Sequence, residues 1–337
     1  MAAENMFERF IHIQSEALLS SEFRLSNGDV TFEDSMFIIV SQSGETLDTY
    51  ISLNNMIASQ ERKGSKKSEM ILLENYPFSS IERLLRKHYG GKMEMLSLAA
   101  GPEICVVATK TYTAQLYLLA LLTLHICALL PDTKNRENIA EILEEAKNIP
   151  EKTLAVLKET SIFIRQLATK QRRNVMQRLM ERITGKREDV CFTIGRGINL
   201  ATAKEGALKL KEVTYASVEG MAGGELKHGS LAVVGSDTPV YIFFPPPADV
   251  NVWQSTFNNF MEVNARNAPI VSICSNSDKS TEVARLSASI IRIPDTHWIF
   301  NPILQVIPIQ LLGYHLAILK GIDPDHPRNL AKTVTVE

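Results

Sequence analysis

The sequence predicts an α/β fold of two domains, each built on a parallel sheet flanked by helices. Short apolar runs, rich in β-branched and aromatic residues and closed by Gly, Ser or Pro, alternate with longer segments of helical spacing. This alternation stops in a long charged segment and restarts near residue 190. The chain of 337 residues is long enough to form two hydrophobic cores.

The alternation of the first half begins at residues 37–40, where Phe-Ile-Ile-Val predicts a buried strand. Apolar residues three or four apart predict a helix over residues 47–61. A second strand is predicted at residues 69–73, a helix at 81–88 and a weaker strand at 95–98. Because helices separate successive strands, the strands should pair in parallel.

Residues 116–130 form an almost wholly apolar stretch, which raises the question of a membrane span. A helix needs about 20 apolar residues to cross a bilayer, and this stretch is shorter. Gln115 precedes it and His125 lies within it, which also disfavours a span. The sequence therefore predicts a core or interface helix here and no membrane partner.

A charged segment, residues 136–188, predicts a helical connector that contains the domain boundary. We expect a first domain over residues 1–165 and a second over 166–337, the latter repeating the α/β plan without a residue-level repeat. Strands are predicted in the second half at residues 190–195, 240–244, 270–274 and 290–293. Helices are predicted there at residues 198–215 and 252–267.

The composition is that of an ordinary globular protein, with 45% hydrophobic and 22% charged residues. A net charge of -2 argues against nucleic acid as an obligate partner. The four cysteines are scattered without metal-ligand spacing, so we expect no metal site. Neither a disulfide framework nor a signal peptide is recognisable, which favours the cytoplasm as the location.

A polar segment, Ser-Gln-Ser-Gly-Glu-Thr, follows directly on the first predicted strand and leads into a helix. The N-terminus of a helix presents unpaired N–H groups and the positive end of its dipole, which favours anions. Ser41, Gln42, Ser43 and Thr46 add hydroxyl and amide donors, and Gly44 permits close approach of the backbone. The segment predicts a phosphate site, although an ordinary N-cap also favours Ser and Thr.

Two further segments carry candidate catalytic side chains. Lys209 and Glu212 are three residues apart on a predicted helix and so share a face, as the members of a surface ion pair also do. His228 lies in the Gly-rich segment 224–229, where a histidine is more often functional than on an apolar face. Lys332 lies near the C-terminal end, where a solvated tail is the alternative.

Taken together, these segments closely resemble the isomerase half of the glucosamine-6-phosphate synthase family, also called glutamine–fructose-6-phosphate aminotransferases. The resemblance extends from about residue 21 to the last residue. Its motifs lie at residues 41–46, 101–104, 109–110, 195–197, 205–212, 224–229 and 327–337. The resemblance implies two SIS (sugar isomerase) domains, each a three-layer αβα sandwich. The family's Cys-Gly-Thr-Ser-type turn has no equivalent here, so the first domain is expected to lack its first strand.

The resemblance also implies substrate contacts in the first domain. Residues matching the polar segment, namely Ser41, Gln42, Ser43 and Thr46, are expected to hold the sugar phosphate. Ala108 stands where the synthases usually carry serine, so that substrate contact is expected to be either missing or replaced by Thr109.

Catalytic roles follow from the same resemblance. Lys332 is expected to form a Schiff base with the carbonyl of fructose 6-phosphate, and Glu212 to move the proton between C1 and C2. His228 is expected to assist ring opening from the neighbouring subunit of a homodimer. Lys209 is expected to stabilise the enolate-type charge. This chemistry needs neither a metal nor another cofactor.

The function implied is the interconversion of fructose 6-phosphate plus ammonia and glucosamine 6-phosphate. The family's glutaminase domain, with its cysteine directly after the initiator methionine, is not found in these residues, so a separate glutaminase subunit is a possible partner. Two alternatives stay open: a stand-alone glucosamine-6-phosphate deaminase, and a non-catalytic SIS sensor of sugar phosphates.

Overall fold

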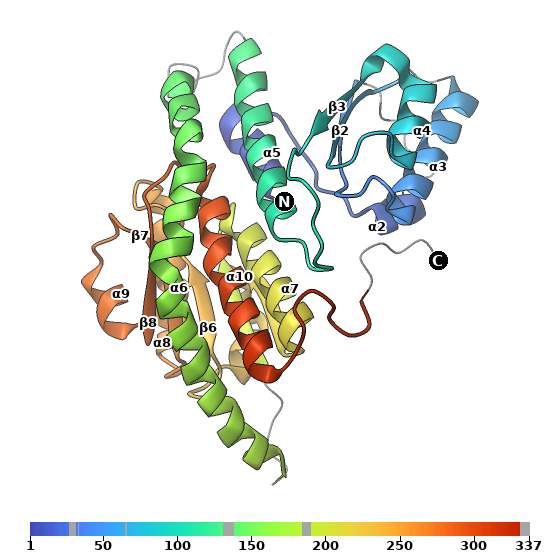
Figure 1. The fold of residues 1–337 in the computed structure, drawn as a ribbon. Helices are drawn as coiled ribbons and strands as arrows, with labels where there is room; N and C mark the ends of the chain where they lie inside the picture. Colours follow the sequence, from blue (N-terminus) through green and yellow to red (C-terminus); the bar gives the residue numbers. More distant parts are fainter. Residues whose placement is uncertain (27–31, 33, 65, 131–137, 184–189, 331–337) are drawn as a thin grey trace. The chain divides into compact units, whose positions relative to one another are not determined.

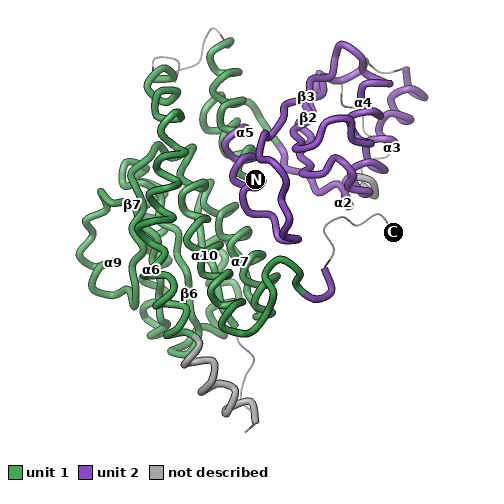
Figure 2. Tube along the Cα trace, viewed as in Figure 1, with its two compact units in different colours: residues 1–15, 119–327 green, residues 16–118, 328–337 purple. Residues whose placement is uncertain are grey.

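A computed structural model describes the chain except for a few short segments (Figure 1). The segments left out are residues 27–31, 33, 65, 131–137, 184–189 and 331–337. The chain divides into two compact units (Figure 2). The small-sheet unit comprises Glu16–Leu118 with Arg328–Glu337, and the large-sheet unit comprises Met1–Ser15 with Leu119–Pro327. The predicted division after residue 165 falls inside the long helix α6 (Ile139–Ile183) and stays a prediction.

Three parallel strands in the order β1-β2-β3 form the sheet of the small-sheet unit. Its strands are β1 (Met36–Val40), β2 (Glu69–Glu74) and β3 (Met93–Ser97). Its helices include α2 (Ser20–Ser26), α3 (Leu47–Lys63) and α4 (Ser80–Tyr89), and the short 3-10 turn η2 (Gly90–Lys92) precedes β3. The predicted strands and helices of this region are confirmed. No strand precedes β1 in the described part of the chain, as expected.

One face of this sheet packs against α3 and α4. Because alternate residues of a strand point to the same face, Ile39, Leu72 and Met93 project together into one cluster. Leu53 from α3 and Leu85 from α4 complete that cluster from the helix layer. The carboxyl ends of the three parallel strands consequently share one edge, and the polar residues that follow each strand are brought together there.

The large-sheet unit contains a five-stranded parallel sheet in the order β5-β4-β6-β7-β8. Its strands are β4 (Val190–Gly195), β5 (Ser217–Ala222), β6 (Val240–Phe243), β7 (Ile270–Ser275) and β8 (Ser289–Ile293). Its helices include α6, α7 (Asn199–Thr214), α8 (Val250–Asn264), α9 (Thr281–Leu286) and α10 (Asn301–Lys320). Short 3-10 turns η4 (Gly223–His228) and η5 (Ser230–Val233) follow β5.

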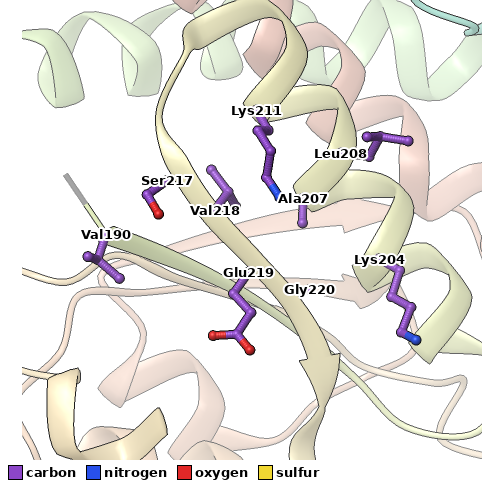
Figure 3. A pocket seen from close by; sticks show the side chains of 9 residues that line it. All are labelled: Val190, Lys204, Ala207, Leu208, Lys211, Ser217, Val218, Glu219 and Gly220. Carbon is purple, nitrogen blue, oxygen red and sulfur yellow. The ribbon is translucent and has the colours of Figure 1, made fainter. Parts of the chain in front are cut away.

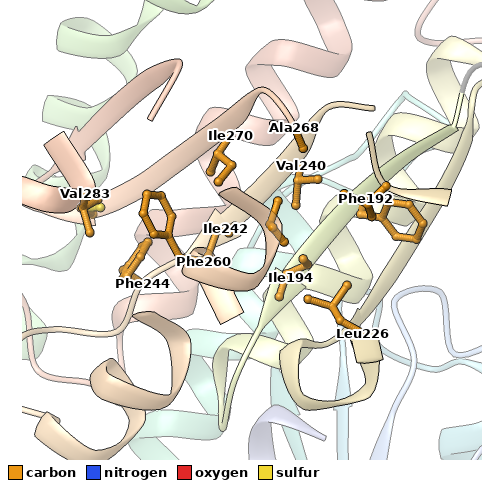
Figure 4. Close-up of a cluster of buried hydrophobic side chains, with 13 residues drawn as sticks. Phe192, Ile194, Leu226, Val240, Ile242, Phe244, Phe260, Ala268, Ile270 and Val283 are labelled. Carbon is orange, nitrogen blue, oxygen red and sulfur yellow. The ribbon is translucent and has the colours of Figure 1, made fainter. Parts of the chain in front are cut away.

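Helices cover both faces of this sheet, which gives the predicted three-layer arrangement. On one face, Phe192 and Ile242 pack with Phe260 of α8 and Val283 of α9 (Figure 4). On the other face, α10 packs against α6 and α7. The unit thus has a buried parallel sheet between two helical layers, and the chain is an α/β protein with two parallel sheets.

Strand β5 is an element that the sequence did not predict. It lies at the sheet edge, where Val218 is its one fully buried side chain, and Glu219 and Gly220 interrupt its apolar pattern. A Cβ at Gly220 would lie 2.6 Å from the Cα of Lys204, so the strand approaches α7 more closely than any side chain allows. Strands are recognised in a sequence by the regular alternation of apolar and polar residues. This strand is half-exposed and contains a glycine at its contact with the helix, so that alternation is weak.

Two helices, α5 (Lys110–Leu129) and α10, are long and apolar enough to cross a membrane by length and composition. In α10, 61% of the most apolar stretch is buried, because this helix packs on α6 and α7. In α5, 39% of the most apolar stretch is buried. Helix α5 contains the apolar stretch for which a helix was predicted. The packing of α10 is that of a core helix.

The N-terminal residues belong to the large-sheet unit, although they precede the small sheet in sequence. They form α1 (Ala2–Met6) and the π-helical turn η1 (Phe7–Ile11). Arg9 forms an ion pair of 3.0 Å with Asp249 and lies 4.3 Å from the ring centre of Trp298. Phe10 is 2% exposed and also contacts Trp298. Ionic and aromatic contacts therefore fix this segment to the rest of the large-sheet unit.

Candidate active site

The predicted anion segment forms a loop, the 41–46 loop, between the carboxyl end of β1 and the first turn of α3. The amide of Ser41 still donates to the carbonyl of Leu73 on β2, so the loop leaves the sheet directly after it. Gly44 has a φ of +66°, a left-handed conformation that glycine adopts without strain. The loop therefore turns sharply and delivers Thr46 to the N-cap position of α3.

Internal hydrogen bonds hold the hydroxyl groups of this loop. The Oγ atom of Ser41 accepts from the amide of Gly44 at 3.1 Å and lies 3.0 Å from Oγ1 of Thr46. The Oγ atom of Ser43 accepts from the amide of Glu45 at 3.1 Å, which leaves its own O–H to donate. Thr46 makes no side-chain capping bond to α3. An ordinary N-cap therefore does not account for this loop, and the helix amides keep their capacity for an anion.

The segment after β2 supports the loop from one side. The amide of Asn75 donates to the carbonyl of Gln42, and the amide of Ile81 donates to the carbonyl of Gly44, both at 3.1 Å. The amide of Ser80 donates to the carboxylate of Glu45 at 2.8 Å. Hydrogen bonding to the side chain and the amide of Ser80 lowers the pKa of Glu45. The backbone of the loop is thus fixed by the neighbouring strand–helix connection, as a preorganised anion site requires.

Asn75 is a positioning residue that the sequence analysis did not single out. Its side chain donates to the carbonyl of Gly101 at 2.8 Å and accepts from the amide of Ala100 at 3.1 Å. Since its own amide holds Gln42, Asn75 connects the 41–46 loop to the segment after β3. An asparagine two residues after the strand predicted at residues 69–73 was the available signal for this role.

Thr109, the further predicted substrate contact, is engaged with Glu103. The amide of Thr109 donates to Oε1 of Glu103 at 2.8 Å, and its hydroxyl donates to the same oxygen at 3.1 Å. Glu103 is 7% exposed and also accepts from the hydroxyl of Thr111. This carboxylate caps the start of α5 and fixes Thr109. The contact of Thr109 with substrate stays a prediction.

In the large-sheet unit, α7 brings Lys209 and Glu212 together as predicted. The ammonium of Lys209 lies 2.8 Å from Oε2 of Glu212 and 3.4 Å from Oε1 of Glu205. Lys209 is 4% exposed, so this is a buried cation between two carboxylates and not a solvated surface pair. Burial raises the pKa of Glu205, while the charge of Lys209 acts in the opposite direction.

The contact between Lys209 and Glu212 is an ion pair without hydrogen-bond geometry. Although the two atoms are 2.8 Å apart, Oε2 of Glu212 receives no hydrogen bond from the described residues. The electrostatic attraction depends on the distance between the two charged atoms, whereas a hydrogen bond also requires a favourable angle at the donor and the acceptor. A short contact without a hydrogen bond is therefore possible. A carboxylate next to a buried ammonium group combines a candidate base with a cation that can stabilise negative charge.

Glu205 is the member of this cluster that the sequence analysis missed. It lies four residues before Lys209, a spacing that places the two side chains on one helix face. That spacing was a visible signal, although it is common on solvated helices too. Glu205 is a positioning residue in the structure because its carboxylate contacts the ammonium of Lys209.

The other two predicted catalytic residues make no contact with this cluster that the structure describes. His228 ends the 3-10 turn η4, is exposed, and has no hydrogen bond to the described residues. An exposed histidine fits the expectation that it serves a neighbouring subunit, which stays a prediction. Lys332 lies outside the described residues, and its role stays a prediction as well.

A cavity of about 590 Å³ lies between α7 and the edge strand β5, on another face of α7 (Figure 3). Lys204, Lys211 and Glu219 supply its charged side chains. None of the predicted site residues lines it. Within the described ranges, no group of three or more His, Cys, Asp or Glu side chains is placed to hold a metal ion.

Comparison with known proteins gives this architecture a class. Residues 187–320 match the SIS domain family. The structure is similar to a glucosamine-6-phosphate deaminase from Thermotoga maritima, with a TM-score of 0.69 at 20% identity, a likeness of fold. Two parallel sheets flanked by helices, with a polar loop after β1 and a charged cluster on α7, define a protein of the SIS class.

The particular family follows from more similar proteins. The solved C-terminal domain of glucosamine-fructose-6-phosphate aminotransferase from Francisella tularensis is 31% identical, with a TM-score of 0.78, and the match covers 97% of this chain and 82% of that domain. The chain belongs to the family of C-terminal domains of glutamine–fructose-6-phosphate aminotransferases.

Full-length relatives agree with this assignment. The aminotransferase of Thermococcus kodakarensis is 35% identical over 340 residues, which cover 100% of this chain and 50% of the relative. That of Clostridium tetani is 37% identical over 98% of this chain and 48% of the relative. The chain thus spans about half the length of these relatives.

Proposed function

We propose that this chain is the sugar-phosphate half of a glucosamine-6-phosphate synthase and forms glucosamine 6-phosphate and water from fructose 6-phosphate and ammonia. The observation that carries the proposal is the buried Lys209 between Glu205 and Glu212, which places a cation beside a candidate base. The names of the relatives, glutamine–fructose-6-phosphate aminotransferase [isomerizing], give the substrates.

The reaction divides into an exchange at C2 and a proton transfer between C1 and C2. The amine of Lys332 attacks the carbonyl carbon C2 of the open-chain sugar, and the carbonyl oxygen leaves as water. Ammonia then replaces the lysine nitrogen at C2, which regenerates Lys332. Glu212 removes a proton from C1 and returns one to C2, while the hydroxyl on C1 loses its proton as the aldehyde forms and the imine nitrogen on C2 gains one to become the amine.

Each charged group has a stated part in this scheme. The 41–46 loop holds the phosphate through the amides of α3 and the hydroxyls of Ser41, Ser43 and Thr46. Lys209 stabilises the negative charge that develops on the C1 oxygen while this hydroxyl loses its proton. In its resting state the same ammonium forms an ion pair with the carboxylate of Glu212, which we propose as the base.

Further parts of the proposal concern assembly and location. A homodimer supplies His228 of one subunit to the site of the other. A glutaminase outside these 337 residues supplies ammonia. The cytoplasm is the proposed location, in keeping with a biosynthetic enzyme of phosphorylated sugars.

Replacing Lys332 with arginine tests the chemistry. Arginine keeps the positive charge but cannot form a Schiff base, because its guanidinium stays protonated. We expect turnover of fructose 6-phosphate with ammonium to fall by a factor on the order of 10³ or more. Reduction with borohydride in the presence of fructose 6-phosphate should label the peptide that contains Lys332 in the unaltered protein and not in Lys332→Arg. Lys279→Arg, at an exposed lysine outside the predicted site, serves as the control and should keep full activity.

The outcomes separate the proposal from its alternatives. Turnover with ammonium and a borohydride label at Lys332 support it. Ammonia release from glucosamine 6-phosphate without net synthesis would assign the chain to deamination instead. Binding of the sugar phosphate with no turnover in either direction would assign it to a sensor.

A further inference from the structure

Glu74 is a buried carboxyl group directly beneath the 41–46 loop. It is the last residue of the central strand β2 and is 0% exposed. Its Oε2 atom accepts from the hydroxyl of Ser79 at 2.6 Å, whereas its Oε1 atom is buried without a hydrogen-bond partner among the described residues. A charged carboxylate with one bare, buried oxygen is costly, so this site favours the protonated form.

The backbone of the loop runs immediately over this carboxyl group. A Cβ at Gly44 would lie 2.2 Å from Oε2 of Glu74 and 2.3 Å from Oγ of Ser79. The carbonyl of Gly44 also accepts from the amide of Ile81 on the helix that Ser79 caps. The backbone of the 41–46 loop therefore packs directly on the carboxyl group of Glu74. A charge on Glu74 lies within a few ångströms of any anion that the loop binds.

Two other carboxylates face Glu74, and both have donors of their own. Glu82 on α4 is 2% exposed and accepts from Nε of Arg86 at 2.7 Å and from the amide of Phe78. Burial alone would raise the pKa of Glu82, but these hydrogen bonds outweigh burial and lower it. Glu45, on the loop itself, is held by the amide of Ser80 and lies near Arg83. Both groups are consequently ionised near neutral pH.

Glu74 is therefore the group of this cluster that titrates near neutrality. Burial raises its pKa to about 7; the hydroxyl of Ser79 acts against burial, and the charges of Glu82 and Glu45 add to it. When protonated, its hydroxyl can donate to the carboxylate of Glu82. When ionised, it adds a third negative charge beneath the loop.

We propose that Glu74 is a positioning residue for the anion loop, and that the loop holds a sugar phosphate only while Glu74 carries its proton. The inference rests on the proposed role of the 41–46 loop in phosphate binding. Its physical basis is repulsion in a water-poor site, where an ionised Glu74 faces a phosphate dianion across the loop backbone. By linkage, binding of the phosphate must be accompanied by proton uptake near neutral pH.

Binding of glucitol 6-phosphate tests this inference, because this sugar phosphate has no carbonyl group and cannot react with Lys332. Isothermal titration calorimetry gives the Kd for the unaltered protein and for Glu74→Gln, whose neutral amide replaces the protonated acid. If only the protonated form binds, the Kd of the unaltered protein rises about fivefold between about pH 7 and about pH 8. The Kd of Glu74→Gln should stay nearly constant.

The ratio of the two Kd values isolates Glu74. The second ionisation of a phosphate monoester, near pH 6, changes the ligand equally for both proteins and so cancels. In addition, the observed enthalpy of the unaltered protein near pH 7 should depend on the ionisation enthalpy of the buffer, since a proton is taken up. This dependence should vanish in Glu74→Gln.

Two further variants complete the design. Glu82→Gln removes a negative charge next to Glu74, so the midpoint of the Kd profile should move to lower pH. Glu94→Gln removes the same charge from an exposed position on the adjacent strand β3 and should leave the profile unchanged. If Glu74→Gln fails to fold, two measurements still test the inference. They are the dependence of the binding enthalpy of the unaltered protein on the buffer, and the shift in the midpoint of the Kd profile in Glu82→Gln.

Each outcome decides the matter. A Kd profile that is the same in the unaltered protein and in Glu74→Gln overturns the inference while leaving the anion loop in place. A profile that rises in the unaltered protein and is flat in Glu74→Gln supports it. If glucitol 6-phosphate binds at no pH, the phosphate role of the loop is wrong, and the inference is overturned with it.

Discussion

Lys209→Met is expected to lower turnover strongly and to destabilise the large-sheet unit by roughly 3–5 kcal/mol. The substitution leaves the carboxylates of Glu205 and Glu212 facing each other without their shared cation. Their side chains are 12% and 20% exposed, so water replaces the lysine only in part. Activity should fall by about 10²–10³-fold in addition, because the charge that stabilises the developing oxyanion is lost.

The destabilisation should depend on pH in a defined direction. Burial raises the pKa of Glu205, and the charge of Lys209, which opposes this shift, is absent in the variant. The protonated form of Glu205 fits the folded state, so the penalty is absent below the unfolded pKa and complete above the folded pKa. Urea unfolding of Lys209→Met should therefore approach that of the unaltered protein at acidic pH and diverge from it as the pH rises.

The exposed Lys204 supplies the matched control for this experiment. It lies on the same helix, and Lys204→Met removes the same charge without a buried partner, so its free energy of unfolding should change by about 0.5 kcal/mol or less. Equal stability of Lys209→Met and Lys204→Met would contradict the buried ion cluster. Full activity of Lys209→Met would remove it from the mechanism.

Gly44→Ala is expected to weaken sugar-phosphate binding by about 10²-fold. The new methyl group would lie 2.2 Å from Oε2 of Glu74, so the loop must move away from the wall that supports it. Since Gly44 has a φ of +66°, the alanine also carries backbone strain of about 1–2 kcal/mol. Calorimetric Kd values for glucitol 6-phosphate and urea unfolding measure the two effects separately.

Gly64→Ala separates strain from collision. Gly64 ends α3 with a φ of +62°, nearly that of Gly44, but a Cβ there meets nothing within 4 Å. The two variants should thus share the backbone strain, and only Gly44→Ala should lose affinity. Wild-type affinity in Gly44→Ala would mean that the 41–46 loop is not the phosphate site.

Much of the small-sheet unit could be predicted because its pattern is local. The run at residues 37–40 ends at Ser41, and an apolar periodicity begins at Leu47, so the strand, the loop and the helix each have their own signal. The spacing of Lys209 and Glu212 likewise fixed their contact before any tertiary information. Such features depend on neighbours within about one turn of the chain.

The remaining features depend on contacts between distant segments. Glu74 follows an apolar strand in sequence and is a charged residue, so a solvent-exposed end was the natural expectation. It is buried because the N-terminus of α4 and the 41–46 loop both fold over it. Asn75 likewise gains its role from Gln42 and Gly101, which belong to different strand ends. No local pattern encodes these arrangements.

The division of the large-sheet unit along the chain determines its order of assembly during synthesis. Arg9 emerges from the ribosome 240 residues before its partner Asp249, a delay on the order of ten to fifty seconds at common elongation rates. The residues 16–118 of the small-sheet unit are continuous and can pack in that interval. The apolar side chains of Phe7, Phe10 and Ile11 are buried only after the five-stranded sheet has been made, so this segment is exposed to chaperones while residues 16–118 are synthesised.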